Sequence, residues 1–71
     1  MRPVLEHFTA HTPGAFVEEK TAALAWHYRM VEPELADRRA QELELRLQEL
    51  LGDAPIEVIA GARVIELRPG A

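Results

Sequence analysis

The clearest pattern of hydrophobic and polar positions lies in the middle of the chain. Apolar residues recur there at spacings of three, four and one, which is the stripe of an amphipathic helix of roughly five turns; they are Ala36, Ala40, Leu43, Leu47, Leu50 and Leu51. Pro33 suits the first turn, where its missing N–H costs no hydrogen bond, and Gly52 suits the end. The pattern predicts a helix over residues 33–51, with Leu43, Leu47 and Leu50 buried against Trp26.

A shorter apolar edge predicts a second helix near the N-terminus. Pro3 again suits a first turn, and the apolar positions Val4, Leu5 and Phe8 follow it at helical spacing. The pattern stops at the turn sequence Thr-Pro-Gly of residues 12–14. We therefore expect a short helix from Pro3 up to this turn.

Two hairpins account for most of the remaining chain. Residues 16–20 and 22–30 predict the first pair of strands, because Leu24, Trp26 and Tyr28 alternate on one side of the second segment. Residues 22–25 alone would favour a helix, but the aromatic alternation after them favours a strand. The outward side of that strand then carries Ala25, His27 and Arg29.

The second hairpin comes after the long helix. Residues 56–59 and 63–67 predict strands joined by a turn over residues 60–62, with its glycine in place. If Ile65 and Leu67 pack inward, Val64, Glu66 and Arg68 face outward.

The order of elements, α-β-β-α-β-β, predicts an α+β fold. We expect a two-layer sandwich in which a four-stranded sheet carries both helices on one face, as a single domain over residues 1–71. The other face of the sheet is then open and polar, and a ligand should bind there.

Composition and charge narrow the possible partners. A domain of 71 residues buries only about 60% of the surface that its unfolded chain exposes, and the absence of cysteine leaves it without disulfides and fits a reducing compartment. The net charge of −4 and the lack of a basic stripe argue against nucleic acid as a partner. No apolar run is long enough for a membrane span or a signal peptide, so we expect no membrane partner and a cytoplasmic location.

The first hairpin holds the candidate chemistry. Glu18 and Lys20 share a face of one strand, and His27 and Arg29 share a face of the next. A carboxylate, an ammonium and a guanidinium on one short hairpin can bind a polyhydroxylated, negatively charged molecule.

Spacing alone favours a less specific interpretation of the same residues. Glu18 and Lys20 could be an ordinary solvated strand pair, and His27 is more often packed or on the surface than catalytic. The three histidines lack the spacing of metal ligands, so no metal site is expected, and Trp26 and Tyr28 are expected in the core.

A resemblance to a known family goes further. Residues 12–20 (TPGAFVEEK) and 24–29 (LAWHYR), followed by residues 55–58 and 63–69, resemble the cap-domain signature of trehalose-6-phosphate phosphatases, in the haloacid-dehalogenase superfamily. The resemblance implies a substrate-recognition cap that closes over a Rossmann-like core of the same protein. That core carries an aspartate nucleophile, a second aspartate and Mg²⁺, and hydrolyses trehalose 6-phosphate to trehalose and phosphate in trehalose biosynthesis.

The resemblance also implies which residues bind substrate. The trehalose-contacting positions of the cap correspond here to Glu18, Lys20, Arg29 and Glu66. The chain departs from the family at His11, where Arg is common, and at Ala15, where Ser is common. It also stops at residues 69–71, before the family's Gly-rich segment with a substrate-binding lysine.

The catalytic core has no counterpart in this sequence. There is no Asp-x-Asp motif, since Asp37 and Asp53 stand alone, so we expect no catalytic residue and no cofactor in this chain, which should be inactive by itself. The alternative to a sugar-binding cap is a degenerate cap, or an independent interaction or structural domain without sugar binding.

Overall fold

A computed structural model describes residues 1–70; Ala71, the last residue of the predicted domain, lies outside the described residues. The elements are α1 (Arg2–Ala10), β1 (Phe16–Glu19), β2 (Leu24–His27), α2 (Pro33–Leu51), β3 (Ile56–Gly61) and β4 (Val64–Pro69). The predicted α+β order, α-β-β-α-β-β, is therefore confirmed.

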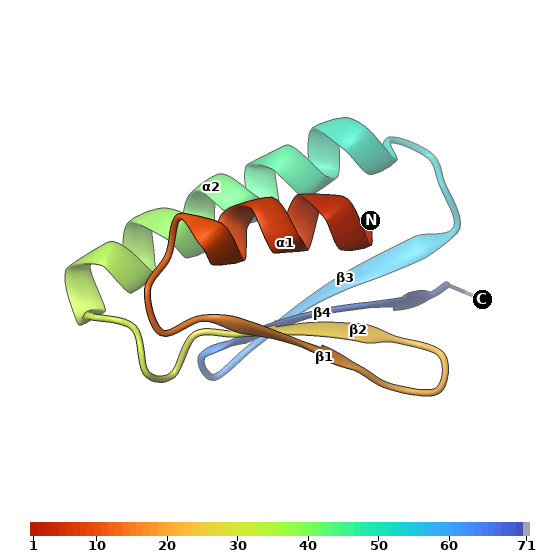
Figure 1. Ribbon diagram of the computed structural model, residues 1–71. Helices are drawn as coiled ribbons and strands as arrows, with labels where there is room; N and C mark the ends of the chain where they lie inside the picture. Colours follow the sequence, from red (N-terminus) through yellow and green to blue (C-terminus); the bar gives the residue numbers. More distant parts are fainter. Residues whose placement is uncertain (71) are drawn as a thin grey trace.

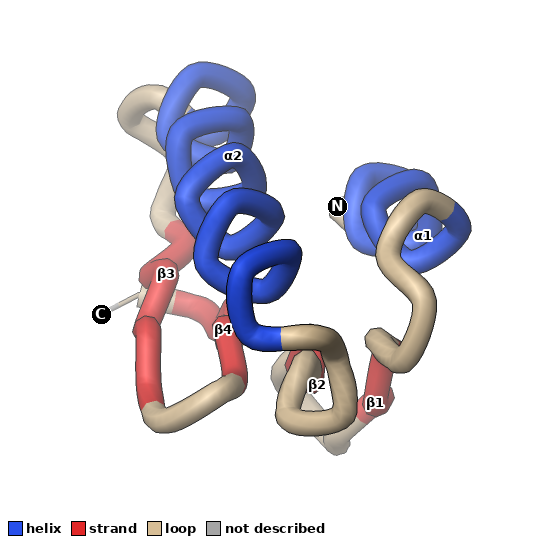
Figure 2. Tube along the Cα trace, turned by 90° about the vertical axis from the view of Figure 1, so that its left-hand side faces the viewer, coloured by secondary structure: helices blue, strands red, loops and turns tan. Residues whose placement is uncertain are grey.

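The strands form one antiparallel sheet in the order β1-β2-β4-β3. Both helices lie on one face of this sheet, which leaves the opposite face without a second layer (Figure 1). Seen along the helices, α2 lies over β3 and β4, and α1 lies beside it over β1 (Figure 2). The chain thus forms the predicted two-layer sandwich, and its open face is the side of the sheet turned away from the helices.

The long helix begins and ends as the sequence predicts. Glu32 precedes Pro33, and its carboxylate accepts hydrogen bonds from the backbone N–H groups of Glu34 (3.1 Å) and Leu35 (2.9 Å). These donors, Leu35 first, lower the pKa of Glu32 below its usual value. Gly52 closes the helix with a φ of 49° and donates its N–H to the carbonyl of Gln48. Glycine reaches such a φ without steric cost.

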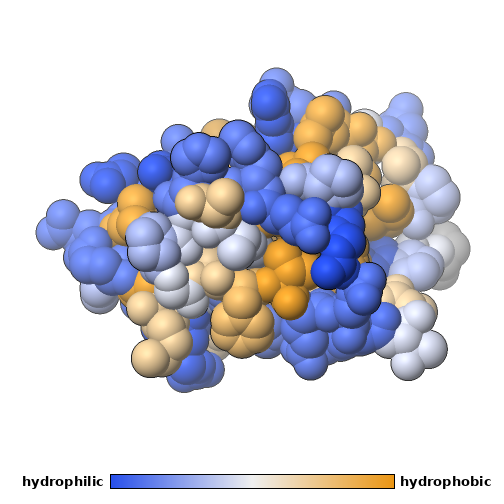
Figure 3. Space-filling view, viewed as in Figure 1, coloured by the Kyte–Doolittle hydropathy of each residue, from blue (hydrophilic) through white to orange (hydrophobic). Residues whose placement is uncertain are grey.

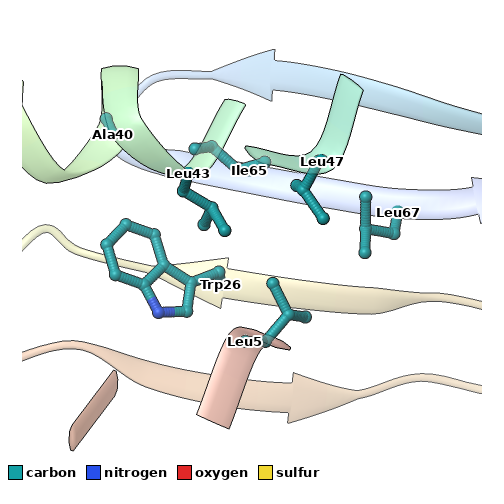
Figure 4. Packing of buried hydrophobic residues seen from close by; sticks show 7 residues of the cluster. All are labelled: Leu5, Trp26, Ala40, Leu43, Leu47, Ile65 and Leu67. Carbon is teal, nitrogen blue, oxygen red and sulfur yellow. The ribbon is translucent and has the colours of Figure 1, made fainter. Parts of the chain in front are cut away.

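The core lies between the two layers. Its buried members come from α1, α2, β2 and β4 and are Leu5, Trp26, Ala40, Leu43, Leu47, Ile65 and Leu67 (Figure 4). The one polar atom of the Trp26 ring is satisfied, because Nε1 donates to the hydroxyl of Thr9 on α1 at 3.1 Å. From the side shown in Figure 3, hydrophobic side chains are visible between the helices and the sheet, with hydrophilic residues around them.

One of the three predicted core leucines is misplaced. Leu43 and Leu47 are fully buried as predicted, but Leu50 is half exposed and Leu51 packs against the core in its place. On a helix of 3.6 residues per turn, positions three and four after Leu47 fall on opposite sides of the stripe. The sheet lies on the side of Leu51, while Leu50 faces a groove toward Val4 on α1.

The first hairpin is shorter than predicted. Strand β1 ends at Glu19 instead of Lys20, and β2 covers Leu24–His27 instead of residues 22–30. The chain must leave the sheet early to start α2, and a turn in which Val31 N–H donates to the carbonyl of Tyr28 makes this change of direction. Gly14 packs against this turn so closely that a Cβ there would lie 2.8 Å from the carbonyl oxygen of Met30.

The turn of the second hairpin begins two residues later and ends one residue later than predicted. Gly61 belongs to β3 and pairs with Val64, so the turn consists of Ala62 and Arg63. Arg63 has a φ of 62°, a left-handed conformation that glycine usually adopts. The guanidinium of Arg63 lies over the ring of Tyr28, 6.0 Å from the ring centre, in a cation–π arrangement.

No helix within residues 1–70 has both the length and the apolar character needed to cross a membrane.

Candidate functional site

Two of the predicted site residues, Glu18 and Glu66, lie on the open face on either side of one residue of β2. The register pairs Glu18 of β1 with Ala25 of β2, and Ala25 with Glu66 of β4. Because paired residues in an antiparallel sheet point to the same face, the two glutamates flank Ala25 on that face. Two strand spacings, roughly 10 Å in total, separate their backbones.

The centre of this row has almost no side chain of its own. Ala25 is fully buried although it lies on the open face. Larger neighbouring side chains therefore cover it. The carboxylates of Glu18 and Glu66 lie on either side of this small residue. We refer to Glu18, Ala25 and Glu66 as the carboxylate row.

Lys20 pairs with Glu66, the carboxylate at one end of the carboxylate row. Its ammonium Nζ donates to Oε2 of Glu66 at 2.8 Å, and both side chains keep contact with solvent. The hydrogen bond with Lys20 is the main reason that the pKa of Glu66 lies below its usual value. The same bond raises the pKa of Lys20, so each partner stabilises the charged form of the other.

His27 holds the other carboxylate. Its Nε2 lies 2.7 Å from Oε1 of Glu18, which lies two positions along β1 from Phe16, the pairing partner of His27. An ionised carboxylate can only accept, so Nε2 carries the proton and donates. The imidazole ring in turn stacks on Phe16, with ring centres 4.8 Å apart and planes 13° from parallel.

Arg29 does not join this group. It lies in the exposed turn after β2, whereas Lys20 lies at the other end of the hairpin, so the expected shared strand face is wrong for Arg29. Within residues 1–70 its guanidinium makes no ion pair. The expectation failed because β2 ends at His27, and strand alternation does not continue past the end of a strand.

The structure adds residues that sequence reasoning left out of the site. Phe16 is half exposed on the open face, and its pairing with His27 follows from the hairpin register. Beyond the carboxylate row, Arg68 pairs with Glu57 at 3.5 Å. The alternation of residues 16, 18 and 20 in the sequence already places Phe16 with Glu18 and Lys20, so that signal was available.

A hollow of about 350 Å³ lies at the Lys20 end of the sheet. Its walls come from the N-terminus, the β1–β2 turn, the start of β3 and the end of β4, and include Met1, Leu24, Ile56, Leu67 and Pro69, with Lys20 and Arg68 beside them. No three His, Asp or Glu side chains in the described part of the chain converge as a metal-binding group. The open face offers the carboxylates of Glu18 and Glu66 as hydrogen-bond acceptors and the ammonium of Lys20 as a donor. Groups of these two kinds can bind hydroxyl groups.

Comparison with known proteins gives the family. The sequence matches the trehalose-phosphatase family along residues 1–71. The chain belongs to this family. Among curated relatives, the trehalose-phosphatases of Saccharomyces cerevisiae and Zygosaccharomyces rouxii are 47% and 44% identical to it over 66 residues. Each of these matches covers 93% of this chain and 7% of the relative.

Solved structures of trehalose-phosphatases have the same fold. That of Aspergillus fumigatus trehalose-6-phosphate phosphatase matches with a TM-score of 0.91 and 40% identity, covering 96% of this chain and 25% of that one. The sequence resemblance and the predicted fold class are thus confirmed. The chain spans about a quarter of that solved protein and a much smaller share of the curated relatives.

Proposed function

We propose that this chain is the substrate-recognition cap of a trehalose-6-phosphate phosphatase, with Glu18, Lys20, Arg29 and Glu66 as the residues that bind the trehalose moiety. The observation that carries the proposal is the carboxylate row, with Lys20 paired to Glu66 and His27 paired to Glu18. Ionised carboxylates accept hydrogen bonds from hydroxyl groups, and an ammonium donates to hydroxyl oxygens. Membership of the trehalose-phosphatase family supports trehalose 6-phosphate as the ligand of this site.

Arg29 has a separate place in the proposal. It lies past the His27 end of the site, opposite Lys20. Its long, exposed side chain would donate to the end of the ligand that is farthest from Lys20, or to a group of the core when the cap closes.

Catalysis in this proposal belongs to the core of the longer protein. That core would supply the aspartate nucleophile and the Mg²⁺ that phosphoryl transfer requires. Met1 and Pro69 line the same hollow at the Lys20 end of the sheet. The two ends of the described chain thus lie close together, which suits a domain carried within a longer chain.

Affinity of this chain for trehalose 6-phosphate should be weak. Each hydrogen bond that the sugar makes to the protein in place of water contributes only about 0.5–1.5 kcal/mol of binding free energy. Association must first offset roughly 4 kcal/mol or more for the translational and rotational freedom that the ligand loses. We expect a dissociation constant in the millimolar range, which corresponds to a binding free energy on the order of −4 kcal/mol.

An NMR titration with trehalose 6-phosphate tests the proposal. Amide signals of residues 16–20, 25–29 and 64–68 should shift, and those of residues 36–51 on α2 should stay in place. Glu66→Gln should weaken binding by up to about tenfold, because an amide is a poorer acceptor than a carboxylate. Glu49→Gln, the same change on the exposed side of α2, is the matched control and should leave binding unchanged.

Shifts confined to α2 would contradict the proposed site. The absence of any shift at ligand concentrations well above the expected dissociation constant would favour the alternative, a degenerate cap or an independent interaction domain without sugar binding.

A further inference from the structure

The two carboxylates of the carboxylate row are held by different kinds of group. Glu66 is paired with Lys20, a long and flexible cation that itself faces the ligand site. Glu18 is paired with His27, a short and rigid side chain on the neighbouring strand. The His27–Glu18 pair thus has a rigid partner for its carboxylate, whereas the Lys20–Glu66 pair has a flexible one.

The imidazole of His27 has little freedom of its own. Phe16 stacks on its ring from β1, and Val64 is its pairing partner on β4. With Nε2 donating to Oε1 of Glu18 at 2.7 Å, one carboxylate oxygen is fixed and Oε2 is left to accept from a ligand. A glutamate on an exposed strand otherwise moves between several rotamers, and ordering it on binding would cost affinity.

We infer that His27, packed on Phe16, is a positioning residue that orients the carboxylate of Glu18 for hydrogen bonds from the sugar hydroxyls. The inference rests on the proposed function, since it assigns a role within the same site. His27 acts through Glu18 and needs no contact with the ligand.

A double-mutant cycle measures this role. The dissociation constant of trehalose 6-phosphate is determined by NMR for the unmodified chain, for His27→Ala, for Glu18→Ala and for the double variant. We expect His27→Ala to weaken binding about three- to tenfold in the unmodified chain and to have no further effect once Glu18 is replaced. His27→Gln should recover part of the loss, because its amide N–H can still donate to Glu18.

Two further measurements separate positioning from a structural effect. In the ligand-free protein, the ¹³C signal of the Glu18 side-chain carboxyl should shift in His27→Ala and return toward its original position in His27→Gln. His7→Ala, the same substitution on the exposed side of α1, should change neither this signal nor the affinity. His27 keeps contact with solvent, so the variants should retain the dispersed amide spectrum of the folded chain.

The outcomes distinguish this inference from the proposed function. If the unmodified chain binds and Glu18→Ala weakens binding while His27→Ala does not, the positioning role is wrong and the proposed function stands. A loss from His27→Ala that is equally large without Glu18 also overturns the role, because His27 would then act on the ligand directly. If the unmodified chain does not bind, the proposed function fails and this inference fails with it.

Discussion

At the scale of single residues, the side chains of the open face form pairs between a carboxylate and a nitrogen-bearing group. Glu66 pairs with Lys20, Glu18 with His27, and Glu57 with Arg68. All of these pairs touch solvent, where water and salt weaken their attraction, so they add little to the stability of the fold. Their consequence is local, since each pair limits where a carboxylate can point.

The Lys20–Glu66 pair gives a prediction about protonation. Lys20→Gln should raise the pKa of Glu66 toward its usual value, because the hydrogen bond from Lys20 is the largest cause of its depression. Arg68→Gln removes a smaller contribution and should raise the pKa less. A pH titration of the Glu66 carboxyl signal by NMR measures both variants, and equal shifts would contradict the ranking.

The sign of the linked stability effect follows from the same shift. The pKa of Glu66 is lower in the folded chain than in the unfolded chain. The pair therefore stabilises the fold at pH values above the pKa that Glu66 has in the unfolded chain. This contribution is lost as the pH falls through the folded-state pKa of Glu66. Lys20→Gln should therefore lose less stability than the unmodified chain over that acid range.

At the scale of elements, stability depends on one face of α2. Leu43 and Leu47 from this helix meet Trp26 from β2 and Ile65 from β4 in the buried cluster (Figure 4). The chain has no disulfide, and a domain of this size has little further apolar burial to draw on. The contact between α2 and the centre of the sheet thus holds the two layers together.

Shortening Leu47 should destabilise the fold strongly. Leu47→Ala removes fully buried methyl groups and leaves a cavity, which typically costs about 2–5 kcal/mol of unfolding free energy. Leu45→Ala is the matched control, because Leu45 lies on the same helix but is 61% exposed, and it should change stability by no more than about 0.5 kcal/mol. Urea denaturation followed by the fluorescence of Trp26 measures both. An unchanged midpoint for Leu47→Ala would show that the core is placed wrongly.

At the scale of the whole molecule, the two-layer form separates packing from recognition. The helices cover one face of the sheet (Figure 1). The carboxylate row lies on the open face. The aspartates lie outside this face, with Asp37 on α2 and Asp53 in the loop that follows it. The site therefore offers groups that bind hydroxyls but no pair of aspartates for phosphoryl transfer.

A test of activity follows from this separation. The chain, incubated with Mg²⁺ and trehalose 6-phosphate, should release no phosphate, because covalent transfer needs an aspartate nucleophile beside metal-binding carboxylates. Phosphate release is measured with a colorimetric assay, with a complete trehalose-6-phosphate phosphatase as the positive control. Turnover that persists after repurification, and that is lost in Asp37→Asn or Asp53→Asn, would contradict the proposed division of labour.

Much of the fold could be predicted because its signals are local. The stripe from Ala36 to Leu51, the proline and glycine at its ends, and the alternation around Trp26 each depend on residues a few positions apart. Resemblance on residues 12–29 added the family, which the comparisons confirm. The face shared by Glu18 and Glu66 also followed from alternation within single strands.

Only the tertiary structure decided the rest, because it depends on where elements meet. The end of β2 is set by the turn into α2, and this moved Arg29 out of the strand. The choice between Leu50 and Leu51 depends on which side of α2 the sheet lies. The pairing of Glu18 with His27, and of Lys20 with Glu66 across 46 positions of sequence, requires the register between strands. A one-dimensional pattern determines which side of a strand a residue occupies, but its partner on that side is determined only when the strands are aligned.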